Sequence, residues 1–133
     1  MCNPARRLKS NDTMNPPWLP DPATEIEVTC SDVAGLAPQI GAGMLVLVDC
    51  REPHEWAFNH LPNSYHLPLG EIMGAKVVPA PLRGVPVIVY CHHGMRSLKA
   101  ARALRAAGHA QAFSMAGGID LWSEEIDAAV PRY

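Results

Sequence analysis

Apolar runs and polar–apolar alternations along the chain predict five strands. The runs Met44–Val48 and Val85–Tyr90 are rich in branched residues, which is typical of buried strands in a parallel sheet. Glu25–Cys30 alternates polar and apolar residues, as a half-buried strand does. Shorter strand patterns follow at Tyr65–Leu67 and Ala110–Met115.

Helical patterns separate these strands. Ser31 caps a helix that ends before Gly41, and Gly108 ends a helix whose apolar face carries Leu98 and Leu104. The expected helices are 31–40, 52–58, 69–73, 96–107 and 119–129. This alternation predicts an α/β fold with a mainly parallel central sheet of about five strands flanked by helices on both faces. Ligands of such sheets bind beyond the carboxyl ends of the strands.

The N-terminal segment differs from the rest of the chain. Residues 1–24 contain five prolines and little apolar periodicity, which predicts an extended or disordered arm. Residues 25–133 are then expected to form one domain, in keeping with a chain of 133 residues.

Composition narrows the choice of partners. The chain has 11 basic and 13 acidic residues, and it lacks an apolar run of the roughly 18 residues that cross a bilayer. We therefore expect neither a nucleic-acid partner nor a membrane partner. The four cysteines lack metal-site or disulfide-framework spacing, and no secretory signal is recognised. Reduced thiols in a cytoplasm are expected, with no metal and no other cofactor.

Charge is distributed unevenly along the chain. Six basic residues and no acidic residue lie between Ile72 and Ile119, so this segment carries +6. Such a field favours a thiolate and attracts small anions. For Lys99, Arg102 and Arg105, a solvated helix face is an equally good interpretation.

The chemistry is expected in the loop Cys91–Ser97, between a buried strand and a helix. Backbone N–H groups of such a loop can form a cradle for negative charge, which stabilises a thiolate at Cys91. Arg96 adds a full positive charge. The alternative is a buried and inert cysteine at the end of a strand.

This loop resembles the active-site loop of rhodanese-domain proteins, the thiosulfate and persulfide sulfurtransferases. Three further segments resemble that family in the family's order, and together the four cover about residues 25–133: Val48–Trp56, His60–Pro68 and Ala116–Trp122. The ending Trp122–Tyr133 resembles rhodanese domains fused to sulfur-activating adenylyltransferases.

The resemblance implies a sulfurtransferase that works through a persulfide on Cys91. A small anionic donor such as thiosulfate supplies the sulfur, and a thiol or cyanide accepts it. The catalytic residue is then Cys91, and the substrate-binding residues are His92, His93, Gly94, Met95, Arg96 and Ser97. Arg96 is expected to bind the donor anion, because its planar fork suits a sulfonate.

Asp49 and Arg51 are expected to support the site as an ion pair that braces the active loop. Cys50 faces the side of its strand opposite to Asp49 and Arg51, so we interpret it as a small core residue. The alternative is that Cys50 is a resolving thiol for Cys91. Asn59 and Asn63 stand where the family commonly has glycine, although asparagine tolerates positive φ better than most residues.

Other functions remain open. A sulfur carrier that docks a relay partner would use the same cysteine with little turnover on thiosulfate. A cysteine phosphatase needs five residues between its cysteine and arginine, whereas four separate Cys91 from Arg96. A purely structural or signalling role would fit a chain that lacked Cys91. Three interpretations are open for His92 and His93. They only line the loop, they act as proton donors or anion ligands, or they bind a metal together with Cys91.

Overall fold

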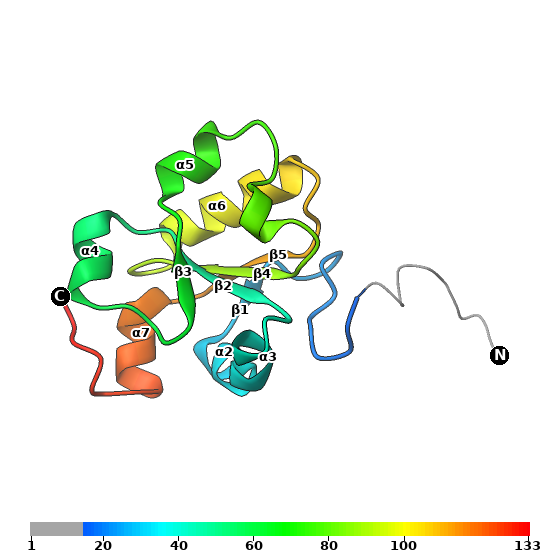
Figure 1. Cartoon of the computed structure of the whole chain (residues 1–133). Helices are drawn as coiled ribbons and strands as arrows, with labels where there is room; N and C mark the ends of the chain where they lie inside the picture. Colours follow the sequence, from blue (N-terminus) through cyan, green and yellow to red (C-terminus); the bar gives the residue numbers. More distant parts are fainter. Residues whose placement is uncertain (1–14) are drawn as a thin grey trace.

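Five parallel strands form one sheet in the order β1-β5-β4-β2-β3, in a computed structural model that describes residues 15–133 (Figure 1). The strands are β1 (Glu27–Val28), β2 (Val46–Asp49), β3 (Ser64–His66), β4 (Val87–Tyr90) and β5 (Ala112–Met115). The predicted parallel α/β fold is confirmed. Strands β1, β4 and β5 lie within the segments that the sequence pattern indicated, whereas β2 ends one residue later than predicted and β3 begins one residue earlier.

Helices connect the strands. They are α2 (Cys30–Gly35), α3 (Ala37–Gly41), α4 (Pro53–Phe58), α5 (Leu69–Gly74), α6 (Met95–Ala106) and α7 (Gly118–Glu125), with a 3₁₀ turn at Ala80–Leu82. The single helix predicted over 31–40 is wrong. Thr29, rather than Ser31, caps α2 through a capping box with Asp32. A proline cannot continue a helix, so a second helix starts with Pro38 in its first turn.

The helices cover both faces of the sheet (Figure 1). On one face α5 and α6 pack over a cluster that we call the α5–α6 core: Val48, Cys50, Leu67, Ile72, Leu82, Val87, Val89, Cys91, Ala100, Leu104 and Ala112. On the other face α2 and α7 pack over the larger α2–α7 core, which includes Leu47, Ile88 and Phe113. Side chains of β2 and β4 alternate between the two cores, as the period of a strand requires.

Residues 15–24 contact the domain. Leu19 is 5% exposed and belongs to the α2–α7 core, and Trp18 packs against that core. The Arg105 guanidinium donates to the carbonyls of Pro22 and Glu25 at 2.9 and 2.7 Å. The first 14 residues of the expected arm lie outside the described residues, and the arm–domain boundary at residue 24 stays a prediction. Within residues 15–133, no helix is long and apolar enough to cross a bilayer.

Candidate active site

Cys91 directly follows β4, at the start of the loop that leads into α6. Gly94 in this loop has a φ of +106°, a left-handed conformation that glycine adopts without strain. The turn points backbone N–H groups inward, so that Cys91 Sγ accepts from Gly94 N at 3.1 Å and from Ser97 N at 3.3 Å. Ser97 Oγ lies 3.5 Å from the same sulfur. The loop therefore offers several donors to one nearly buried sulfur.

These surroundings lower the pKa of Cys91 to about 4. The largest cause is the neighbouring Cys50 thiol. Burial opposes the shift, while the hydroxyl and N–H of Ser97 and the N–H of Gly94 add to it. At neutral pH the thiol of Cys91 is therefore ionised, and the thiolate is the form that attacks electrophiles.

The first turn of α7 holds the Cys91 loop through two backbone hydrogen bonds. Ile119 N donates to Cys91 O at 2.8 Å, and Asp120 N donates to His92 O at 3.1 Å. Gly118 has a φ of +63°, and a Cβ at this position would lie 2.3 Å from His92 O. Only glycine permits this close approach, so the double-glycine segment supports the loop through its backbone.

Arg96, in the first turn of α6, is bound to a carboxylate from α4. Its two terminal nitrogens donate to the oxygens of Glu55 at 2.8 and 2.9 Å. Tyr133 OH donates to the same carboxylate at 2.6 Å. Against the effect of burial, the bonds from Arg96 and then Tyr133 hold the pKa of Glu55 well below its usual range. The Arg96 side chain is still 34% exposed, and a guanidinium has five N–H donors.

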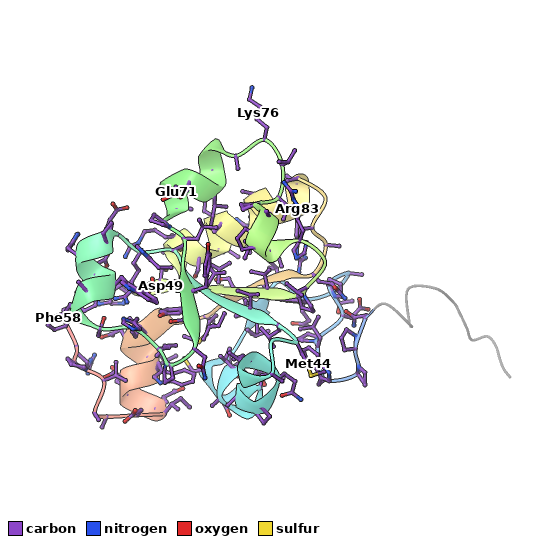
Figure 2. All side chains as sticks on the ribbon, in the orientation of Figure 1. Met44, Asp49, Phe58, Glu71, Lys76 and Arg83 are labelled. Carbon is purple, nitrogen blue, oxygen red and sulfur yellow. The ribbon has the colours of Figure 1, made fainter. Side chains whose placement is uncertain are left out.

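Asp49 and Arg51 form a buried ion pair at the carboxyl end of β2, near the middle of the molecule (Figure 2). Arg51 Nη2 lies 2.7 Å from Asp49 Oδ2, and neither side chain is exposed. Arg51 also donates to Asn59 Oδ1 at 2.8 Å and to Tyr133 OH at 2.7 Å. With its donors so satisfied, the buried guanidinium ties β2 to the loop after α4 and to the C-terminal segment.

The histidines and Met95 form the outer side of the loop. His92 stacks on the Tyr133 ring at a centroid distance of 3.8 Å, and burial followed by the charge of His93 lowers the pKa of His92. The His93 side chain is 62% exposed, and Met95 extends into solvent. Within residues 15–133, no three His, Cys, Asp or Glu side chains gather as a metal site requires.

Two residues that the sequence reasoning missed complete the site. Glu55 holds Arg96, and Tyr133 contacts Glu55, Arg51 and the His92 ring. Both residues lie in segments that resemble the family, Val48–Trp56 and Trp122–Tyr133, but no pattern there indicates these contacts. The place of Glu55 three residues after Glu52 indicates only a capped helix start.

The basic segment between Ile72 and Ile119 does not act as one surface. Arg105 donates to backbone carbonyls and lies over the Phe113 ring at 5.1 Å, so it is a structural residue rather than part of a solvated face. Lys99 and Arg102 are exposed, and Lys76 projects far from the rest of the molecule (Figure 2).

Asparagine takes on specific roles where the family commonly has glycine. Asn63 is the one non-glycine residue with positive φ among residues 15–133, at +58°. Asn59 is extended, and its side chain both accepts from Arg51 and donates to Pro131 O. Both replacements therefore fit the fold.

Comparison with known proteins agrees with this geometry. Residues 32–125 match the rhodanese-like domain. Thiosulfate sulfurtransferase GlpE of Pseudomonas fluorescens is 36% identical over 83 residues, which are 62% of this chain and 74% of that protein. A rhodanese-related protein from Thermoplasma volcanium has a TM-score of 0.61 at 29% identity and covers 76% of this chain and 93% of its own.

The human single-domain sulfurtransferase TSTD1 has the same fold, with a TM-score of 0.61 at 24% identity, covering 74% of this chain and 96% of its own. The segment matched by the family begins in α2 and ends with α7, so it contains β2, β4 and the whole Cys91 loop. The resemblance in the sequence is thus confirmed, and the chain belongs to the rhodanese-like domain family.

Proposed function

We propose that this chain is a sulfurtransferase that moves sulfane sulfur from thiosulfate to a thiol or cyanide through a persulfide on Cys91. The observation that carries the proposal is the position of Cys91 Sγ, which accepts N–H groups of Gly94 and Ser97 in a nearly buried loop. The 36% identity to a protein named thiosulfate sulfurtransferase supports the choice of donor.

The transfer takes two displacements. The Cys91 thiolate attacks the outer sulfur of thiosulfate, the sulfur–sulfur bond of the donor breaks, and sulfite leaves with the electron pair. The enzyme then carries Cys91–S–S⁻. An acceptor thiolate or cyanide attacks the outer sulfur, which gives a new persulfide or thiocyanate and returns the Cys91 thiolate.

The chain's own residues supply the charge stabilisation. The inward N–H groups of the loop hold the anionic sulfur without reorganisation, as preorganised donors do at other anion sites. Arg96 binds the sulfonate end of the donor with the N–H groups that Glu55 leaves free. Asp49 and Arg51 keep the neighbouring strand end in place through their buried ion pair.

Phosphatase chemistry fits this site less well. Hydrolysis of a phosphate ester needs an acid that protonates the leaving group. Glu55 is the carboxyl group that binds Arg96 of the loop, and its lowered pKa keeps it ionised. The loop is also one residue shorter than a phosphatase loop. Hydrolysis of an aryl phosphate by wild type, abolished in Cys91→Ser, would revive that function.

A sulfur carrier for a partner protein is the second candidate. An open hollow of about 400 Å³ begins at Met95 beside the loop, and Lys99 and Arg102 contribute to its lining between α5 and α6. Its apolar lining and two cations suit an acidic partner with an apolar anchor. Fast persulfide exchange with a protein thiol together with feeble thiosulfate turnover would favour the carrier.

The direct test is thiocyanate formation from thiosulfate and cyanide. Wild type is expected to turn over, and Cys91→Ser is expected to fall to background while keeping its fold. Cys30→Ala is the matched control, because Cys30 is also fully buried but bonds to carbonyls of the β5–α7 turn. Activity above background in Cys91→Ser would overturn the mechanism.

A further inference from the structure

Cys50 lies beside the Cys91 nucleophile although the two are far apart in sequence. Strands β2 and β4 pair in parallel with Asp49 opposite Tyr90, and Cys50 N donates to Tyr90 O at 3.1 Å. Cys50 and Cys91 are the next positions along these two strands. Both side chains enter the α5–α6 core, where they are 0% and 1% exposed. The two thiols are therefore buried neighbours.

Hydrogen-bond donors are shared unequally between these two sulfurs. Cys91 Sγ accepts the N–H groups of Gly94 and Ser97, whereas Cys50 sits among apolar side chains of the α5–α6 core. Asp49, whose charge also disfavours a thiolate at Cys50, immediately precedes it in the chain. A negative charge is therefore more stable on Cys91, and the proton stays on Cys50.

The same division appears in the titration of Cys50. The pKa of Cys50 is raised strongly, first by the neighbouring Cys91 side chain, then by burial, and then by the charges of Cys91 and Asp49. Arg96 opposes this shift only weakly. A thiol that stays protonated is a donor that can point at its ionised neighbour.

We propose that Cys50 is a positioning residue for the nucleophile: its protonated thiol donates an S–H hydrogen bond to Cys91 Sγ and thereby stabilises the Cys91 thiolate. A bond of this kind is charge-assisted and so stronger than one between two neutral thiols. The benefit of this hydrogen bond rests on the proposed function, because sulfur transfer needs a persistent thiolate. The thiolate itself is measurable without any sulfur donor.

This role differs from that of a resolving thiol. A resolving cysteine attacks the persulfide, and the attacking species is its thiolate. Burial and the neighbouring negative charges disfavour that form at Cys50. Cys50 is therefore expected to act as a hydrogen-bond donor to Cys91 rather than as a nucleophile.

Other charged groups around Cys50 and Cys91 also influence the pKa of Cys91. Asp49 precedes Cys50 in the chain and acts on it through its charge, and Arg96 acts on both sulfurs from α6 with its partner Glu55 from α4. These groups stay in place when only Cys50 is changed. A difference between Cys50 variants then reports on the Cys50 side chain.

The test is the rate of Cys91 alkylation by iodoacetamide as a function of pH, followed by mass spectrometry of the peptide that carries Cys91. Wild type is expected to have its midpoint near pH 4. In Cys50→Val the donor is lost, and the midpoint should rise by about one pH unit or more. In Cys50→Ser a hydroxyl replaces the thiol as donor, so the midpoint should stay close to that of wild type. Cys30→Ala should leave it unchanged.

Two results would overturn the inference. One is a Cys50→Val midpoint equal to that of wild type, and the other is an equal rise in the Ser and Val variants, which would indicate packing rather than hydrogen bonding. If Cys50→Val does not fold by circular dichroism, Cys50→Ala removes the donor with a smaller side chain. If wild type forms the persulfide normally but the alkylation midpoint of Cys50→Val is not shifted, this inference is wrong and the proposed function stands. If the midpoint of Cys50→Val is shifted but wild type forms no persulfide, the proposed function is wrong and this inference stands.

Discussion

The guanidinium of Arg96 is already held by Glu55 before any donor is present. A flexible arginine loses side-chain entropy when it binds an anion, and this loss is smaller for one that is held in advance. Tyr133 holds the same carboxylate and stacks on His92, so the proposed anion-binding side of the loop is prearranged from three separate segments. The pairing with Glu55 also reduces the net positive charge that a donor meets.

We expect Arg96→Ala to raise the apparent KM for thiosulfate by about tenfold or more, since a hydrogen bond to a charged group contributes about 1.5–3 kcal/mol. Steady-state kinetics with cyanide measures this. Arg102→Ala is the matched control, because Arg102 lies on the same helix and is exposed. An unchanged KM in a folded Arg96→Ala protein would remove Arg96 from donor binding.

The first turn of α7 acts on the site through its backbone. It binds the carbonyls of Cys91 and His92 and so fixes where the loop N–H groups point. This contact requires that no side chain fills the space at Gly118. The double glycine therefore contributes to the site without reaching the reacting sulfur.

Gly118→Ala should destabilise the protein by about 2–5 kcal/mol, because a left-handed φ and a clash with the backbone add together. Sulfur transfer should fall with it. Gly84→Ala is the control, since Gly84 has a φ of +78° but open space around its Cβ position. It should lose only about 1 kcal/mol in urea unfolding and keep its activity. Equal losses in the two variants would show that the close approach at Gly118 does not matter.

Local patterns predicted the strands and the position of Cys91, because branched apolar runs and strand-to-helix loops are properties of neighbouring residues. The pattern missed the break at Leu36, where Pro38 restarts the helix. It also left Arg105 open as a solvated residue, because two of its carbonyl partners, Pro22 and Glu25, lie 83 and 80 residues away in the sequence. The contacts of Glu55 and Tyr133 depend on how distant segments are packed, and no periodicity records that.

Residues 15–24 are joined to the domain by an apolar contact and by hydrogen bonds. Leu19 enters the α2–α7 core, and Arg105 of α6 reaches the carbonyls of Pro22 and Glu25. Residues 15–24 therefore cover apolar surface that the domain would otherwise expose. Their removal is expected to reduce stability.

We expect Leu19→Ala to lower the free energy of unfolding by about 2–4 kcal/mol, as loss of a buried leucine does. Urea denaturation measures it. Met44→Ala serves as the control, because Met44 is 50% exposed and should change stability by less than about 1 kcal/mol. If Leu19→Ala is as stable as wild type, residues 15–24 are an independent arm.

The central claim is that Cys91 carries the transferred sulfur, and the intact mass of the protein after incubation with thiosulfate tests it most directly. We predict that wild type gains one sulfur atom, that cyanide removes it, and that Cys91→Ser gains none. The same addition to Cys91→Ser, or no addition to wild type with either thiosulfate or glutathione persulfide, would contradict the account.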